Sequence, residues 1–427
     1  MLRPPRPRGP GPAGLCVRRH RARAAPSRAV PAVWPAVHPG HPARGLHGLD
    51  RGGVCCPLDP RPFPRPSRLW SPRMSAALPP ARRAPLGPPL DLVHGVVERG
   101  HGGGGRTMVH LVETLFRAAF TNPALDAGND HAVLARPAGR VVVSTDAHVV
   151  SPLFFPGGDI GSLSVHGTLN DVAMAGAVPI ALSAAFILEE GFPLADLARI
   201  VASMAEAARE AGVPIVTGDT KVVERGHGDG VFITTTGVGV VAEDLDIRGD
   251  RAQPGDVVVV SGPIGAHGVA ILSQREGLSF ETPVVSDSQS LHDLVAALVA
   301  AVPDIHVLRD PTRGGVAATL NEIADQSGAG MVLEQEAIPV APGVAGVCEL
   351  LGLDPLTLAC EGRLLALCAE ADAPALMAAL TAHPKGREAR IIGRVVADPH
   401  RFVRLITPFG GQRLVDWLSG DQLPRIC

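Results

Sequence analysis

The first 90 of the 427 residues cannot build a hydrophobic core, and this limits where the chain can fold. They hold 21 Pro, 16 Arg and no Lys, and their only acids are Asp50 and Asp59. Such a segment, with few aliphatic residues and a net charge of +14, cannot bury enough apolar surface to offset its chain entropy. We therefore expect residues 1–88 to be a disordered extension and order to begin near Asp91.

Several roles for this extension can be weighed. It lacks the apolar stretch of a signal peptide, and its prolines forbid the amphipathic helix of a transit peptide. The favoured interpretation is a non-functional leader from an early start codon, with Met74 as the true start. A nucleic-acid-binding arm is the alternative, but no aromatic stacking pattern supports it. No apolar run reaches the roughly 18 residues of a membrane helix, so neither nucleic acid nor membrane is expected as a partner.

The seven cysteines form no CxxC pair and are odd in number, which indicates neither a disulfide framework nor a zinc site. Reduced thiols in a cytoplasmic protein are the simple interpretation. Cys427 is the last residue and ends a segment that looks too polar and broken to be core. A thiol on a flexible tail can carry a chemical group between two protein surfaces, unless its position is an accident.

Strands and helices mix in both halves of the remainder, which predicts an α/β or α+β fold. We expect domains at 89–250 and 251–407 and a flexible tail at 408–427. The apolar periodicity predicts helices over 107–120, 162–178, 194–211, 269–275, 290–301 and 316–327. It predicts strands over 141–143, 180–188, 214–216, 232–241, 257–260, 331–333 and 363–370, with a last pair within 388–408.

A glycine-rich loop at 101–105 opens directly onto the first predicted helix. Glycines let the backbone approach an anion, and a helix N-terminus offers unpaired N–H donors. The loop matches neither a P-loop nor a dinucleotide fingerprint, and a flexible hinge is the plain alternative. The candidate nucleotide-binding residues here are His101, Gly102, Gly103, Gly104 and Gly105.

Four aspartates recur at the ends of predicted apolar segments: Asp130, Asp146, Asp171 and Asp219. Each alone is typical of a helix cap. Together with the glycine loop and Lys221 they favour a site for Mg²⁺ and a nucleotide, because Mg²⁺ prefers a few carboxylates plus phosphate oxygens.

The second half adds two candidates. Arg313, in DPTRGG, offers a planar fork for a phosphate or carboxylate, or else it holds a turn. Glu361, in ACEGRLL, is either a base or a turn former. The scattered histidines show no metal spacing and are interpreted as structural or solvated.

These segments, in this order, resemble the PurM superfamily of ATP-dependent enzymes, and within it the hydrogenase maturation family HypE. The matching pieces lie within residues 92–427: HGGGGRTM, STDAHVVSPLFFPGGDIGSLSVHGTLNDVAMAGAVP, GDTKVV, SGPIGAHGVAI, DPTRGG, CEGRL and the terminal PRIC. The resemblance implies a two-domain subunit and a homodimer with a shared sheet or barrel, with ATP bound near the interface.

The resemblance further implies that a HypF-type carbamoyltransferase loads a carbamoyl group onto the terminal cysteine. ATP then drives its dehydration to an S-cyanide. The cyanide passes to iron on a HypC–HypD complex, for the active site of [NiFe]-hydrogenase.

On this basis Cys427 is the carrier, Glu361 the base, and Lys221 a phosphate clamp or a guide for the tail. The four aspartates would hold Mg²⁺, and Asn170 and Arg313 would contribute to the nucleotide site. Cys360 stands where the family has Asn, and Asn129 replaces one acid of an acidic pair. A selenophosphate synthetase is a rival, but the glycine loop has no Cys or Lys. A non-enzymatic thiol carrier is another, against which the aspartates argue.

Overall fold

A computed structural model of the chain describes residues 90–135, 137–278, 283–417 and 425–427. The Pro/Arg-rich segment 1–88 and the expectation of disorder there lie outside these residues. The described residues belong to one compact unit. Within the described part of the chain, no helix is long and apolar enough to cross a membrane.

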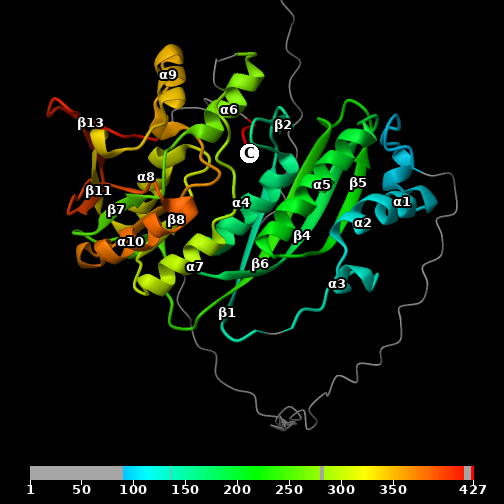
Figure 1. Ribbon diagram of the computed structural model, residues 1–427, viewed down its shortest axis with the longest axis horizontal. Helices are drawn as coiled ribbons and strands as arrows, with labels where there is room; N and C mark the ends of the chain where they lie inside the picture. Colours follow the sequence, from blue (N-terminus) through cyan, green and yellow to red (C-terminus); the bar gives the residue numbers. More distant parts are fainter. Residues whose placement is uncertain (1–89, 136, 279–282, 418–424) are drawn as a thin grey trace, which may run out of the picture. The chain divides into compact units, whose positions relative to one another are not determined.

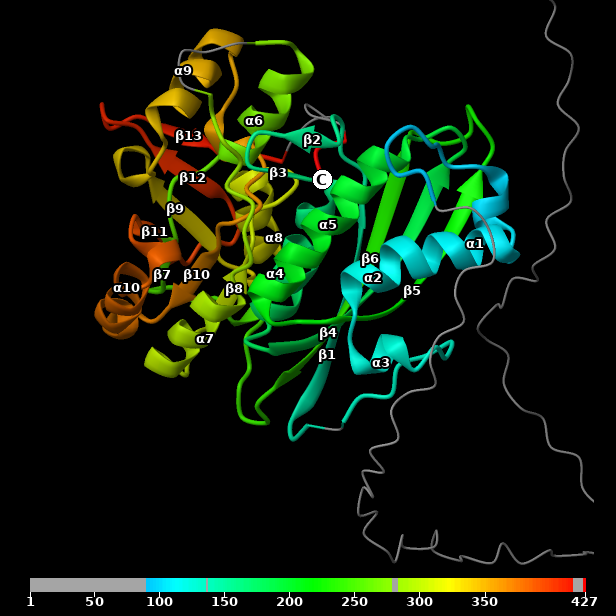
Figure 2. The same ribbon diagram turned by 45° about the vertical axis from the view of Figure 1, so that its right-hand side comes forward.

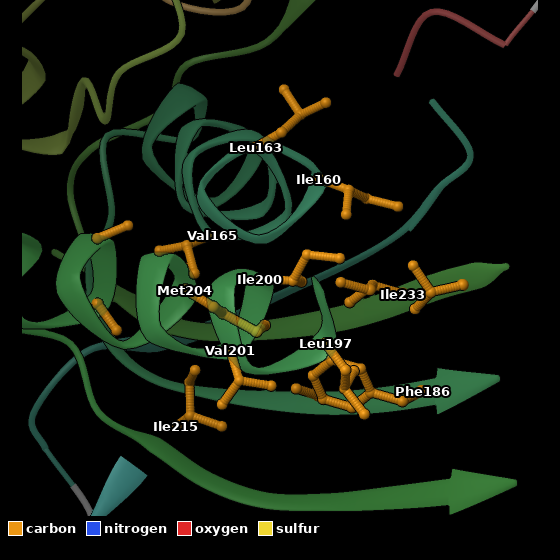
Figure 3. Close-up of a cluster of buried hydrophobic side chains, with 14 of the residues drawn as sticks. Ile160, Leu163, Val165, Phe186, Leu197, Ile200, Val201, Met204, Ile215 and Ile233 are labelled. Atoms are coloured by element: carbon orange, nitrogen blue, oxygen red, sulfur yellow. The ribbon is translucent and has the colours of Figure 1, made fainter. Parts of the chain in front are cut away.

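The first half of this unit is built on a four-stranded sheet with the order β1-β6-β4-β5. These strands are β1 (Arg140–His148), β6 (Val231–Val241), β4 (Val178–Glu189) and β5 (Ile215–Val223). Helices α4 (Ile160–Met174) and α5 (Leu194–Ala211) lie side by side on one face, as Figure 1 shows. Ile160 and Val165 of α4 lie beside Ile200 and Met204 of α5 in the first core cluster, whereas Leu163 points to the other side of α4 (Figure 3).

The opposite face of this sheet is apolar and uncovered in the single chain. Val141 and Val143 on β1 are 65% and 61% exposed, and Val178 on β4 is 60% exposed. The alternation along β1 places the intervening side chains, such as Asp146 and His148, toward α4. One face of the sheet therefore carries the core together with Asp146 and His148, and the other is uncovered and carries Asp219 and Lys221 at the β5 edge.

The second half is a seven-stranded sheet with the order β13-β12-β9-β11-β7-β10-β8. Its strands are β7 (Val257–Val260), β8 (Val307–Arg309), β9 (Gly330–Glu334), β10 (Leu365–Cys368), β11 (Arg390–Val396), β12 (Val403–Ile406) and β13 (Gln412–Leu414). Strand β7 is four valines in a row, all buried. Val257 and Val259 pack toward α7 (His292–Ala301) and α10 (Ala373–Ala382), and the other two toward α8 (Gly315–Ser327). A continuous apolar run is what a strand covered on both faces requires.

Apart from His166, Asn170 and Asp171, helix α4 consists of apolar and small residues, as a helix that is buried on nearly all sides requires. It lies against its own sheet and α5, and Val172 and Ala173 near its end pack in the core that includes α7. Residues at the end of α4, Asn170 and Asp171, therefore face the second half of the molecule.

The two-domain PurM-like fold class is confirmed, and most predicted elements form. The helix predicted over 194–211 matches α5, but the one predicted over 162–178 ends at Met174. Gly176 has a φ of 72° there and turns the chain into β4. The strand predicted over 214–216 runs on to Val223. Helix α9 (Pro342–Leu351) and α10 were not predicted. The expected domain limits stay a prediction.

The glycine loop lies beside β5. A short 3-10 turn, η1 (Arg99–Gly102), precedes a continuous helical stretch formed by α1 (Arg106–Leu111), a π-helical turn and α2 (Arg117–Phe120). A Cβ on Gly102 would lie 2.6 Å from the backbone N of Val222, so only glycine fits against β5. Gly104 and Gly105 face open space, and Gly104 has a φ of 73°.

Candidate active site

The C-terminal residues Arg425–Cys427 dock in the body of the protein. Ile426 forms an isolated antiparallel β-bridge with Val150. On either side of it, the Val149 N–H donates to the main-chain oxygen of Cys427 at 2.9 Å, and the Ser151 N–H donates to the Arg425 carbonyl at 3.1 Å. Ile426 is only 5% exposed and joins the first core cluster. The expectation of a segment too polar to be core is wrong for Ile426, which backbone pairing brings into the core, whereas Arg425 stays exposed and Cys427 is half-buried. In both views the chain end lies beside β2 (Phe154–Phe155) (Figures 1 and 2).

Helix α6 (Ala266–Arg275) contacts the tail with two side chains. His267 donates from Nε2 to the Ile426 carbonyl at 2.7 Å. Arg275 donates to the Ser151 carbonyl at 2.7 Å and to the Arg425 carbonyl at 2.9 Å. The Arg425 side chain pairs with Asp229, and its backbone takes a φ of 57°, which is uncommon outside glycine. The tail is thus recognised largely through its backbone.

The docked thiol of Cys427 lies in an acidic environment. Burial raises its pKa, the Glu361 carboxyl adds to this rise, and the Arg313 guanidinium opposes it. Asp146 and Asp171 act in the same direction as Glu361. The docked thiol is therefore protonated at neutral pH and is not a nucleophile in this position.

Gly167 on α4 marks where the two halves of the site face each other. A Cβ there would lie 3.1 Å from His148 Cε1, 3.7 Å from an Asp146 oxygen and 3.9 Å from a Glu361 oxygen. The missing side chain leaves room for groups from β1 and from the loop before β10 to converge. Burial lowers the pKa of His148 despite its neighbour Asp146, so the imidazole is neutral.

The structure adds Asp310, from the DPTRGG segment, to the acidic group. This carboxyl is buried, and one of its oxygens has no hydrogen-bond partner. Burial and the neighbouring Asp171 raise its pKa to about 7. Burial likewise raises the pKa of Asp171, which accepts a hydrogen bond from Ser144 at 2.9 Å. Sequence reasoning singled out Arg313 in this segment and missed Asp310, although an acid at the end of a buried strand was the available signal.

Glu361 is held by its backbone, and its carboxyl is left free. Its N–H donates to Asp287 at 3.1 Å, and its carbonyl accepts from the Asn170 amide at 3.3 Å. One carboxyl oxygen is buried without a partner. Burial and the nearby Asp310 raise the pKa of Glu361 well above its ordinary value. The preceding Cys360 points elsewhere, and its sulfur accepts from the Gly265 N–H at 3.2 Å.

Lys221 and Asp219 lie on the open edge strand β5. The ammonium contacts both Asp219 oxygens, at 2.7 and 2.6 Å, and holds the pKa of that carboxyl below its usual range. Beside them is a largely apolar cavity of about 220 Å³, walled by Val112, Phe116, Phe120, Phe186 and Ile215, with Asp219 at its edge. The glycine loop packs on the same strand.

Asp146 and Asp219 occupy opposite edges of the sheet, inside β1 and β5 and not at element ends as expected. Asp146 pairs with Thr235, Thr235 with Ala184, and Ala184 with Gly218, the neighbour of Asp219. Three strand spacings of roughly 4.8 Å put the two backbones about 14 Å apart. Across the described ranges, no three acidic, His or Cys side chains form a group that could hold a metal by themselves.

Other candidate residues take different positions. His101 is buried, and its Nδ1 accepts from the Glu98 N–H at 2.9 Å, which closes the turn before the glycine loop. The Asn170 amide donates to the Gln289 carbonyl at 3.0 Å, and its oxygen accepts from the Leu291 N–H at 2.7 Å. Asp130 is exposed in an irregular segment away from regular elements. The geometry gives His101 and Asn170 supporting contacts with the backbone.

Comparison with known proteins agrees with this architecture. Residues 128–241 match the family model of the AIR synthase related protein N-terminal domain, and residues 253–406 match that of the C-terminal domain. The carbamoyl dehydratase HypE of Cupriavidus necator is 67% identical over 340 residues, covering 79% of this chain and 97% of that protein.

Solved structures agree too. The chain in a crystal structure of the hydrogenase maturation protein HypE in complex with ATP is 51% identical and has a TM-score of 0.75. The match covers 77% of the present chain and 99% of that chain. The matching chain of a solved HypE–HypF complex is 47% identical, with a TM-score of 0.64. This match covers 72% of the present chain and 99% of that chain. With its terminal cysteine docked beside Glu361 and its full-length match to these relatives, the chain belongs to the HypE family of carbamoyl dehydratases.

Proposed function

We propose that the chain dehydrates an S-carboxamide carried on Cys427 to an S-cyanide, with ATP as the phosphoryl donor, in the maturation of [NiFe]-hydrogenase. The observation that carries this proposal is the position of the terminal thiol, docked among Glu361, Asp146, Asp171 and Arg313. A carbamoyl group on that sulfur would extend one bond further into this acidic group. The conversion of an amide to a nitrile removes an oxygen and two protons, so it needs an activated oxygen and a base.

The carboxylates suit a magnesium–nucleotide complex better than a bare ion. Asp310 keeps a buried oxygen without a partner, and burial together with repulsion from Asp171 raises its pKa. A divalent cation relieves such repulsion, and Mg²⁺ binds through one or two carboxylates together with waters and phosphate oxygens. We assign Asp171 and Asp310 to hold it together with phosphate oxygens, with Asp130, Asp146 and Asp219 as further candidates. Bound Mg²⁺ would neutralise charge on the transferring phosphoryl group.

The chain's own groups divide the remaining work. Arg313 faces the thiol and can clamp a phosphate oxygen with its planar fork. The carboxamide oxygen displaces ADP from the γ-phosphorus, which turns a poor leaving group into phosphate. Glu361 takes one N–H proton from the phosphorylated carboxamide, and the second N–H proton leaves with the phosphate as hydrogen phosphate when the C–O bond breaks and the C≡N bond forms. Its raised pKa makes the carboxylate a stronger base for this step.

Loading of the carbamoyl group fits an undocked tail. The thiolate is the reactive form of cysteine, and docking raises the pKa of Cys427. A HypF-type carbamoyltransferase would therefore meet the tail outside the site, consistent with the solved HypE–HypF complex. The cyanide would leave by the same route for a HypC–HypD iron complex.

Two copies of the chain would complete the nucleotide site. The cavity, Lys221 and the glycine loop lie at the β5 edge, whereas the thiol and its carboxylates lie at the β1 edge. The apolar open face of the sheet is suited to pairing with a second copy. A homodimer with a shared sheet or barrel would bring the β5 edge of one subunit toward the β1 edge of the other. The base would occupy the apolar cavity, and the phosphates would run past Gly104 and Lys221.

The test is the mass of the C-terminal peptide after incubation with the carbamoyltransferase, carbamoyl phosphate and ATP. We expect a carbamoyl adduct on Cys427 in loaded protein that has been freed of nucleotide and of the carbamoyltransferase, and a cyano adduct, lighter by one water, when ATP is then added. The Cys427→Ala variant should bind ATP as the native chain does and give no adduct. Absence of any adduct with an active carbamoyltransferase present would refute the proposal. A carbamoyl adduct that ATP never converts would instead indicate a non-enzymatic carrier.

A further inference from the structure

His267 has no part in the chemistry described so far, yet it is fully buried and joins the tail to the body. Its Nε2 lies 2.7 Å from the Ile426 carbonyl, and its Nδ1 lies 2.8 Å from the Ser286 hydroxyl. The ring meets the edge of Phe155 at a centroid distance of 5.4 Å. A side chain so confined has one orientation in which both nitrogens are satisfied.

The hydrogen bonds fix which nitrogen carries the proton. A carbonyl oxygen only accepts, so Nε2 must be the N–H. Burial lowers the pKa of His267 to about 4, so the ring is neutral and Nδ1 is an acceptor. The Ser286 hydroxyl then donates to Nδ1, and its oxygen in turn accepts from the Ser288 N–H at 3.1 Å. By donating to Nδ1, Ser286 keeps the Nε2–H of His267 directed at the Ile426 carbonyl.

The residue after Ser286 holds the proposed base. Asp287 accepts from the Glu361 N–H at 3.1 Å, and its buried carboxyl lies 3.7 Å from Arg363. The carbonyl of Asp287 is so close to Gly362 that a Cβ there would approach it to 1.8 Å. Ser286 is itself fixed, since its N–H donates to the Pro156 carbonyl at 2.8 Å. One short segment, residues 286–288, therefore contacts both the residue that holds the tail and the backbone of Glu361.

We propose that His267, oriented by Ser286, is a positioning residue that holds the C-terminal segment in register, so that a group on Cys427 lies against Glu361. The inference rests on the proposed function for its catalytic consequence. The docking of the tail by His267 can be tested without any turnover.

The first experiment compares His267→Gln with His267→Asn. Gln can present its amide N–H near the position of Nε2, whereas the shorter Asn reaches only toward Ser286. Both lose the ring contact with Phe155 equally, so they form a matched pair. The readout is the rate at which iodoacetamide alkylates Cys427 in the full chain, followed by mass spectrometry of the C-terminal peptide. Cys348, elsewhere in the same molecule, is the internal control.

We expect His267→Asn to raise the alkylation rate of Cys427 about fivefold or more, which is the loss of one hydrogen bond of ordinary strength. His267→Gln should stay near the native rate, and the Cys348 rate should not change in either variant. Equal alkylation rates of Cys427 in the native chain and in the His267→Asn variant would overturn the proposal. So would equal acceleration in Gln and Asn, because the lost ring packing would then be the cause. If the alkylation rate of Cys348 rises as well, the Ser286→Ala variant decides. An unchanged alkylation rate of Cys427 in that variant contradicts the proposal, and a rise at Cys427 without one at Cys348 supports it.

The second experiment starts from carbamoylated protein and measures cyano adduct formation in a single turnover. His267→Asn should slow this step while loading by the carbamoyltransferase keeps its native rate, because loading does not need the docked tail. A native dehydration rate in Asn would contradict the proposal. If the native chain itself forms no cyano adduct, the proposed function fails, while the alkylation result still judges the docking role.

Discussion

At the scale of single residues, Glu361 is a carboxyl surrounded by other carboxyls. Replacing it with Gln keeps its shape and removes both its basicity and its repulsion with Asp310. We expect Glu361→Gln to lower the dehydration rate by about 10²- to 10⁴-fold, the usual worth of a general base. Its thermal midpoint should equal or exceed that of the native chain. Single-turnover cyanide formation and a melting curve measure the two effects, and a native rate would exclude Glu361 as the base.

His267 also makes the stability of the fold depend on pH. Its pKa is about 4 when folded and near 6.5 when unfolded, so the unfolded chain takes up the proton first as the pH falls. Stability contributed by the neutral ring is complete above pH 6.5 and declines between pH 6.5 and 4. The loss approaches about 3 kcal/mol at the lower limit. Urea unfolding at several pH values should show a shallower decline in His267→Gln than in the native chain. A parallel decline in both would contradict this assignment.

Residue types and spacing reveal only part of such a site. Glu361, Asp146 and Asp171 could be proposed because each stands in a recognisable segment. Asp310 could have been proposed on the same ground, because it directly follows the buried strand β8. Asp287 and His267 could not, because their significance comes from contacts with residues far away in the chain. The His267 contact with Ile426 spans 159 positions. No local pattern encodes such a pairing.

At the scale of elements, α4 and α5 approach closely at a glycine. A Cβ on Gly161 would lie 2.2 Å from the Ile200 carbonyl oxygen, a backbone atom that cannot turn aside. We expect Gly161→Ala to destabilise the protein by about 1–3 kcal/mol, as overpacking does. Gly346 in α9 is the matched control, since a Cβ there meets nothing within 4 Å.

Gly346→Ala should be neutral or stabilise the protein by up to about 1 kcal/mol, because alanine favours a helix. Urea unfolding of both variants measures the contrast. Equal stability of the two would mean that α4 and α5 can separate without cost.

Element boundaries were predictable where a local signal exists. Helix α5 ends where the sequence indicates, because Gly212 adopts a φ of 68° just after it. Strand β5 was predicted too short, because its Gly218-Asp219 pair is typical of a turn. Pairing with β4 holds that pair in the strand, from Ile215 to Val223. Tertiary pairing overrides local propensity there.

At the scale of the whole molecule, the open face of the first sheet predicts self-association. A charge in the middle of this face should oppose it, because burying an unpaired carboxylate is costly. We expect Val143→Asp to shift the chain from dimer toward monomer and to weaken ATP binding, with the subunit fold intact. Sedimentation velocity and calorimetric titration with ATP measure these effects.

Leu350→Asp is the control for that experiment, because Leu350 is 69% exposed on α9, away from the sheet. It should leave both association and ATP binding unchanged. A Val143→Asp chain that remains fully dimeric would place the interface elsewhere.

The docked tail has a consequence for how its sequence can vary. His267, Arg275 and the backbone N–H groups of Val149 and Ser151 bind it through main-chain oxygens, which every residue possesses. Such a site therefore depends more on the position of each residue relative to Cys427 than on the identity of its side chain. One inserted residue moves a β-strand partner by roughly 3.4 Å and turns its side chain to the other face. The spacing of these contacts from Cys427 is therefore under tighter constraint than the composition of the segment, and one residue inserted between Arg425 and Cys427 would displace the sulfur from its place.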